Sequence, residues 1–87
     1  MKATAEEYEF HHRMLDPDDP VAFAELASWL YSDLVEEALW REGPHADAHL
    51  VEEAVGEALL DYCDAPDRYD PERSSLRGYL LMAAHGD

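Results

Sequence analysis

The sequence predicts an all-α domain, a compact bundle of about four helices. Apolar residues recur at three- and four-residue spacing, no run alternates apolar and polar residues over a strand length, and Pro- and Gly-containing segments divide the chain into helix-sized pieces. The chain has 87 residues, of which 47% are hydrophobic. This length suits one folded domain with its own core, without metal or disulfide support.

The N-terminal segment, residues 3–15, is expected to form a short helix. Its expected anchors are Tyr8, Phe10, Met14 and Leu15. Adjacent residues on a helix point in different directions, so His11 and His12 are interpreted as surface residues that share no metal. We take residues 1–15 as an N-terminal helical extension and residues 16–87 as the main domain.

A long central helix is expected from Asp19-Pro20 to about Glu42, because Asp before Pro is a typical cap and first-turn pair. Its apolar residues occupy more than one face, which favours a central position in the bundle. We expect most of its aromatic residues, Trp29, Tyr31 and Trp40, to pack in the core, although aromatic residues are also enriched at interfaces. Gly43-Pro44 ends the helix.

A third helix is expected from near Asp47 to about Cys63. Its apolar stripe consists of Leu50, Val51, Ala54, Val55, Ala58, Leu59 and Tyr62. Gly56 interrupts this helix and suggests a close approach of another helix. After two Pro-containing turns, Ser75 is a suitable cap for the last helix. The apolar residues of that helix are Leu76, Tyr79, Leu80 and Ala83.

The chain is strongly acidic, with 21 Asp and Glu against 6 Lys and Arg and a formal net charge of -15. Such a charge repels the phosphate backbone of free duplex DNA and suits a basic protein partner, although it can also serve solubility alone. The single cysteine, Cys63, excludes an intrachain disulfide, and the acidic N-terminus lacks the pattern of a signal peptide. These features indicate a cytoplasmic protein.

No catalytic constellation or Gly-rich phosphate loop is visible, so the chain is not expected to be an enzyme. His45 and His49 are four residues apart, but one element alone would supply such a metal site, and we expect no metal and no cofactor. The aspartates at 61, 64, 67 and 70 lack the interior glycine and closing glutamate of a calcium loop.

Two motifs stand in order between residues 47 and 84. The first is Asp47-Ala-His-Leu-Val-Glu-Glu-Ala-Val, and the second is Asp67-Arg-Tyr-Asp-Pro-Glu-Arg-Ser-Ser-Leu-Arg-Gly-Tyr-Leu-Leu-Met-Ala-Ala. Together they resemble region 2 of bacterial RNA polymerase sigma factors of the extracytoplasmic-function type. In that family Asp-Ala-Glu-Asp-Leu-Val-Gln-Glu precedes Arg-Phe-Asp-Pro-x-x-Gly-Ser-Phe-x-x-Trp-Leu. The resemblance covers roughly residues 20–87 and implies a sigma region 2 fold.

The resemblance implies that the third helix grips the clamp helices of the polymerase β′ subunit. By position, His49 stands where the family has Asp, Val51 matches, Glu52 replaces Gln and Glu53 matches Glu. Leu50 or Val51 would then mostly support the core, while Glu52 and Glu53 would face the partner. Taken without the family, the same acidic side chains are also consistent with a solvated helix face.

The resemblance implies promoter contacts by the segment from Ser75 to Asp87, and these only within the polymerase complex. Met82 and Gly86 depart from the family's usual Arg and Asn. Candidate contacts to single-stranded DNA, through charge and stacking, are Arg68, Tyr69, Arg73, Arg77 and Tyr79. Alternatively, the three arginines pair with Asp67, Asp70 and Glu72 beside them.

The function expected from the resemblance is docking on RNA polymerase in transcription initiation, with an anti-sigma factor as a further possible partner. A chain continuing beyond Asp87 would be expected to add a basic promoter-reading helix. The alternative is an acidic helical protein-interaction module, such as a DNA mimic or an antagonist of a basic partner, on a sigma-like scaffold.

Overall fold

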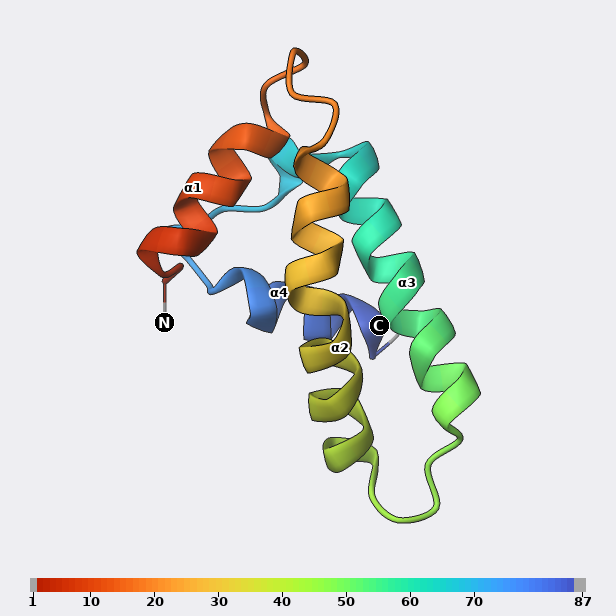
Figure 1. Cartoon of the computed structure of the whole chain (residues 1–87). Coiled ribbons are helices and arrows are strands. Elements are labelled where there is room, and N and C mark those ends of the chain that lie inside the picture. The colour runs from red at the N-terminus through yellow and green to blue at the C-terminus, as the bar shows by residue number, and fades with distance from the viewer. Residues whose placement is uncertain (1, 86–87) are drawn as a thin grey trace.

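The computed structural model describes residues 2–85 and confirms the all-α prediction, since that range contains four α-helices and no strand. The elements are α1 (Ala5–Met14), α2 (Ala22–Glu42), α3 (Ala48–Asp64), the 3-10 turn η1 (Pro66–Arg68) and α4 (Leu76–Ala84). Figure 1 shows α2 and α3 side by side as an antiparallel hairpin, with α1 beside the upper part of α2 and α4 behind the pair.

The hairpin turn follows the local signals in the sequence. Gly43 ends α2 with a φ of 95°, a conformation that favours glycine, and its N–H donates to the carbonyl of Leu39. Asp47 caps α3 by accepting from the N–H groups of His49 and Leu50 at 3.0 and 3.3 Å. Both ends of the turn therefore lie close to where they were expected.

The expected cap at the start of α2 is wrong. The helix begins at Ala22, its N-cap residue is Val21 and not Asp19, and Val21 makes no side-chain cap hydrogen bond. The carboxylate of Asp19 accepts a 2.8 Å hydrogen bond from Nε of Arg13, the main cause that lowers the pKa of Asp19, and the backbone groups of Val21 and Ala22 lower it further. Glu25 binds the same guanidinium at 2.9 Å. The Asp19 side chain thus ties the end of α1 to the start of α2.

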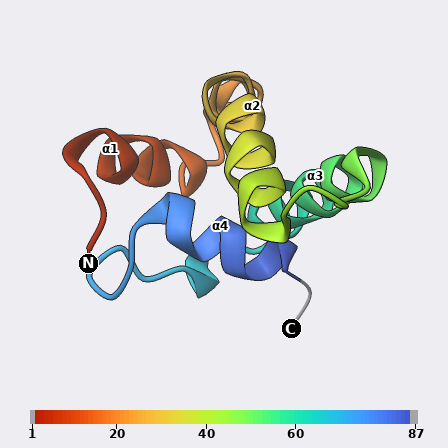
Figure 2. The ribbon, with the colours of Figure 1, turned by 90° about the horizontal axis from the view of Figure 1, so that it is seen from below.

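The core lies where α4 crosses the hairpin. Seen from below, α4 runs under α2 and α3, and α1 lies on the side of α2 away from α3 (Figure 2). The buried apolar cluster comprises Leu26, Leu30, Leu34, Val55, Ala58, Leu59, Tyr62, Tyr69, Leu76 and Leu80. Ser75 caps α4 as expected, by accepting from the N–H of Gly78 at 3.0 Å.

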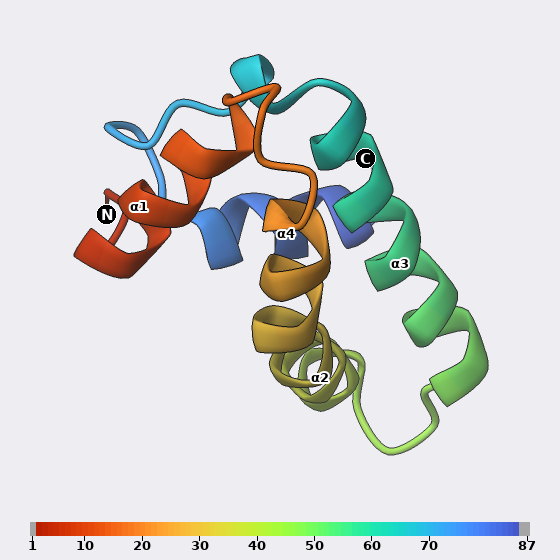
Figure 3. The same cartoon turned by 45° about the horizontal axis from the view of Figure 1, so that its top comes forward.

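Helix α1 packs against the same core. Its Phe10 ring stacks on Trp29 of α2 with ring centres 4.9 Å apart, and Met14 also contacts the core cluster. Figure 3 shows the segment between α3 and α4 passing along α1, where the N–H of Ala3 donates to the carbonyl of Pro71 at 2.9 Å. Leu15 was expected to be an anchor, but it is 47% exposed because the chain turns away at the end of α1.

Two further expectations are corrected by the packing of α2 and α3. Trp40 is 82% exposed, because it lies on the polar side of α2 that also carries Asp33, Glu36 and Glu37. A methyl group added at Gly56 would meet no atom within 4 Å, so this glycine provides no close helix approach. Among the described residues, no helix is long and apolar enough to cross a membrane.

Candidate protein-interaction surfaces

The first candidate surface lies on the exposed side of α3, and we call His49, Glu52 and Glu53 the α3 ridge. All three residues are exposed, with 80% of the His49 side chain and 61% of the Glu53 side chain accessible. Nε2 of His49 lies 3.5 Å from Oε1 of Glu53, one helical turn away. The sequence interpretation that Glu52 and Glu53 point outward agrees with this geometry.

The two apolar residues beside the ridge differ from each other. Val51 is half-buried and packs against the core, whereas Leu50 is 61% exposed. The ridge is held in place from below, because the hydroxyl of Tyr31 on α2 donates to the backbone carbonyl of Glu52 at 3.4 Å. Val51 therefore supports the core, as was expected of Leu50 or Val51, whereas Leu50 does not.

The second candidate surface, the arginine and tyrosine set expected to contact DNA, is divided between solvent and core. Arg68 on η1 and Arg73 in the following turn are exposed and make no ion pair with any residue between 2 and 85. Arg77 on α4 is held in place: its Nη1 lies 3.2 Å from Oδ2 of Asp33, and its guanidinium carbon lies 5.3 Å from the centre of the Trp29 ring. The alternative that the three arginines pair with Asp67, Asp70 and Glu72 is wrong, since residues 2–85 contain no such ion pair.

Tyr69 corrects the expectation of an exposed stacking ring. It is only 3% exposed, and its hydroxyl donates to the carbonyl of Ser74 at 2.7 Å. The ring meets His11 edge-on and lies against Tyr79, with both ring centres 4.9 Å away. Burial is the main cause that raises the pKa of Tyr69 to about 12. A base can stack on this ring only if the core opens, while Tyr79 remains half-buried.

A buried carboxylate joins the N-termini of two helices. Glu7 is 1% exposed; its Oε1 accepts from the N–H of Thr4 at 2.8 Å, and the Thr4 hydroxyl accepts from the N–H of Glu7 in return, completing a capping box. Its Oε2 accepts from the N–H of Arg77 at 3.0 Å, in the first turn of α4. One side chain therefore satisfies a free N–H at the start of α1 and another at the start of α4.

His11 and His12 were both expected at the surface. His12 is exposed, but the expectation is wrong for His11, which is only 6% exposed. The Nδ1 atom of His11 lies 2.6 Å from the hydroxyl of Tyr62, within hydrogen-bond distance. Burial lowers the pKa of His11, partly opposed by Asp70, and it raises the pKa of the Tyr62 hydroxyl above its usual value. The imidazole helps to fix α1 against α3.

Neither Glu7 nor His11 was identified as a site residue from the sequence. A local sequence pattern indicates the role of only one of them, Glu7. The Thr4-x-x-Glu7 spacing is a capping box that the sequence displays. Nothing local to His11 distinguishes it from His12. Between residues 2 and 85, no buried polar side-chain atom lacks a hydrogen-bond partner, and no group of three or more His, Cys, Asp or Glu could hold a metal ion.

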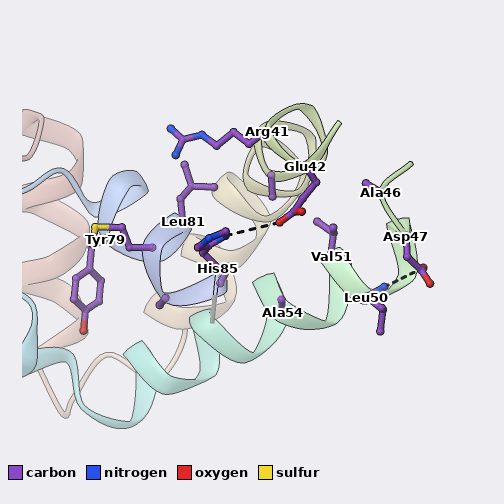
Figure 4. A pocket seen from close by; sticks show the side chains of 14 residues that line it. Arg41, Glu42, Ala46, Asp47, Leu50, Val51, Ala54, Tyr79, Leu81 and His85 are labelled. Atoms are coloured by element: carbon purple, nitrogen blue, oxygen red, sulfur yellow. Dashed lines mark hydrogen bonds and ion pairs between the residues drawn. The ribbon is translucent and has the colours of Figure 1, made fainter. Parts of the chain in front are cut away.

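The third candidate surface is an open groove at the turn end of the helical hairpin, which we call the terminal groove (Figure 4). It has a volume of about 810 Å³ and lies between the last turns of α2, the first half of α3 and the end of α4. Its apolar lining includes Ala38, Leu50, Val51, Ala54, Leu81 and Met82. Glu42 on α2 pairs across it with His85, whose Nδ1 lies 3.8 Å from Oε1 of the carboxylate.

Comparison with protein-family models, with curated proteins and with solved structures finds no match to this chain. The likeness to sigma region 2 therefore depends on the two motifs quoted above.

Proposed function

We propose that this domain docks on RNA polymerase through the α3 ridge, as a sigma-factor-like domain acting in transcription initiation in the cytoplasm. The observation that carries the proposal is the exposure of His49, Glu52 and Glu53 on the helix whose motif resembles the polymerase-binding helix of sigma factors. Exposed carboxylates on a helix that is packed firmly against the core can form charge-assisted hydrogen bonds to the basic side chains of the β′ clamp helices.

The way α3 is fixed also supports this role. The Asp47 cap sets the start of the helix, Val51 anchors its first turns and the Tyr31 hydroxyl holds the Glu52 carbonyl. A surface that is ordered before binding loses less conformational entropy when the partner arrives. The net charge of -15 further favours encounter with a basic partner.

The side chains expected to contact the promoter are only partly accessible in the folded domain. Arg68 and Arg73 are exposed, but Tyr69 is buried and Arg77 is engaged with Asp33 and Trp29. We therefore propose that DNA is engaged only inside the polymerase complex, where the enzyme supplies positive charge and separated strands.

The test is binding of the purified domain to isolated β′ clamp helices. The double charge reversal Glu52→Lys with Glu53→Lys should weaken binding by about 10- to 100-fold, since like charges then face each other. The matched control is Glu6→Lys with Glu9→Lys, which changes the net charge equally at two exposed positions on α1. The control should bind within a few-fold of the parent domain.

A second candidate function follows from the charge. Apart from buried Glu7 and half-buried Asp19, every Asp and Glu between residues 2 and 85 is exposed. Such a surface suits an acidic interaction module that antagonises a basic protein. Equal loss of binding in the two double reversals would favour this module over a polymerase-docking ridge.

A further inference from the structure

The terminal groove exposes large apolar side chains that contribute little to the fold. Leu50 is 61% exposed on its α3 wall, and Met82 is 72% exposed on its α4 wall. Val51, Ala54 and Leu81 extend this surface inward toward the core cluster. The apolar surface is therefore continuous from α3 to α4, and contiguous exposed apolar surface with a polar rim is typical of an interaction site.

The shape of the groove suits a helix. Three helices form its walls, and the lining continues along the α3 face from Leu50 to Ala54, one full turn. Figure 4 shows Val51 turned toward α2, whereas the side chain of Leu50 points away from α2 at the outer edge of the lining, so Val51 supplies the inner contact and Leu50 only an edge contact. A partner helix can fill such a groove with apolar residues spaced i, i+3, i+4 and i+7.

The charge around the groove selects the kind of helix. Glu42 and Asp47 line it, and Glu57 follows Ala54 by three residues on the same side of α3. Two lining residues are basic: Arg41 pairs with Glu37 at 3.3 Å, and His85 lies 3.8 Å from Glu42. With His85 neutral, the lining residues carry two negative charges and one positive charge, and Glu37 beside Arg41 adds a third negative charge. The rim is thus acidic overall, so it disfavours an acidic occupant and favours a basic one.

We propose that the terminal groove binds an amphipathic helix of a partner protein, with an apolar stripe in the groove and Lys or Arg residues against the acidic rim. A second copy of this chain is a poor occupant, because each copy carries a net charge of -15 and would bring like-charged rims together. The groove is a different face of α3 from the ridge of His49, Glu52 and Glu53, so the proposal does not depend on polymerase docking.

The probe is a synthetic peptide of about 16 residues made of Leu, Ala and Lys, with Leu at the helical spacing above. Its control is a scrambled peptide of the same composition, because any cationic peptide is attracted to so acidic a protein. We expect the patterned peptide to bind the whole chain at about 0.15 M salt at least about tenfold more tightly than the scrambled peptide. Titration calorimetry measures both affinities.

Leu50→Ser and Met82→Ser, both at exposed residues, test the role of the groove. The matched control is Leu60→Ser, because Leu60 is 56% exposed on another side of α3. Each groove substitution should weaken binding of the patterned peptide about 5- to 10-fold, whereas Leu60→Ser should leave it unchanged. Circular dichroism checks that all three variants keep the parent helicity.

Four results would overturn the proposal. The first three are equal affinity for patterned and scrambled peptides, no binding of the patterned peptide at about 1 mM, and parent-like binding by both groove variants. Self-association in sedimentation experiments that Leu50→Ser abolishes would also overturn it, in favour of a second copy as the occupant.

Discussion

Replacing Glu7 by Gln should destabilise the domain more than any other single loss of charge in α1. The carboxylate is 1% exposed and accepts from two backbone N–H groups, those of Thr4 at 2.8 Å and Arg77 at 3.0 Å. A glutamine offers one oxygen, so its amide nitrogen must face one of these donors. One of these two partly buried contacts is then lost, and its backbone donor has no acceptor on the side chain.

The expected magnitude follows from those two contacts. A hydrogen bond to a charged group contributes about 1.5 to 3 kcal/mol, and a neutral one contributes about 1 kcal/mol. Losing one contact of Glu7 and weakening the other therefore costs about 2 to 4 kcal/mol. In a domain of this size each kcal/mol lowers Tm by about 4 to 8 °C.

The assay is urea unfolding followed by circular dichroism, and the matched control is Glu6→Gln. Glu6 lies in the same first turn of α1 but is exposed, so its replacement removes the same charge near the helix N-terminus without breaking these hydrogen bonds. That control should cost below about 1 kcal/mol, the scale of the helix-dipole term. Equal destabilisation by the two variants would refute the reasoning that Glu7 caps both helices.

Three further predictions concern stability, pH and DNA. Gly56→Ala should raise the free energy of unfolding by about 0.5 to 1 kcal/mol, because the added methyl group meets open space in a helix interior. In thermal melts Gly78→Ala should show no such gain, since its methyl group would lie 2.9 Å from the capping hydroxyl of Ser75; equal stabilisation of both variants would contradict this. Because burial lowers the pKa of His11 below 6.5, the unfolded chain binds the proton first, so this residue should reduce stability as pH falls below about 6.5. In urea melts between about pH 7 and pH 5, the range in which histidine titrates, His11→Gln should therefore lose less unfolding free energy than the parent protein. If the two proteins lost the same amount, the prediction would be contradicted. Finally, fluorescence titration of the isolated chain with labelled promoter duplex should show no sequence-selective binding, since the net charge is -15.

The candidate surfaces were only partly accessible from the sequence. The outward direction of Glu52 and Glu53 followed from the apolar stripe on α3, because a helix separates its two faces by spacing alone. The same stripe contains Leu50, which lies at the edge of the terminal groove and not in the core. Periodicity assigns a residue to a side of a helix, but which neighbouring helix covers that side depends on the packing.

The sequence alone determined the all-α class, the approximate ends of α3, the start of α4 and the stop at Gly43, because caps, glycine and helical periodicity act within one or two turns. Tertiary structure decided which residues are buried and which polar groups meet. Glu7 reaches the N–H of Arg77 across 70 residues, and His11 reaches Tyr62 across 51. These contacts exist because α1 packs beside α4 and the end of α3. No local pattern encodes the position of α1. Most of the stabilisation of a helix in a protein comes from burying its apolar face, and the surface against which that face is buried exists only in the folded arrangement.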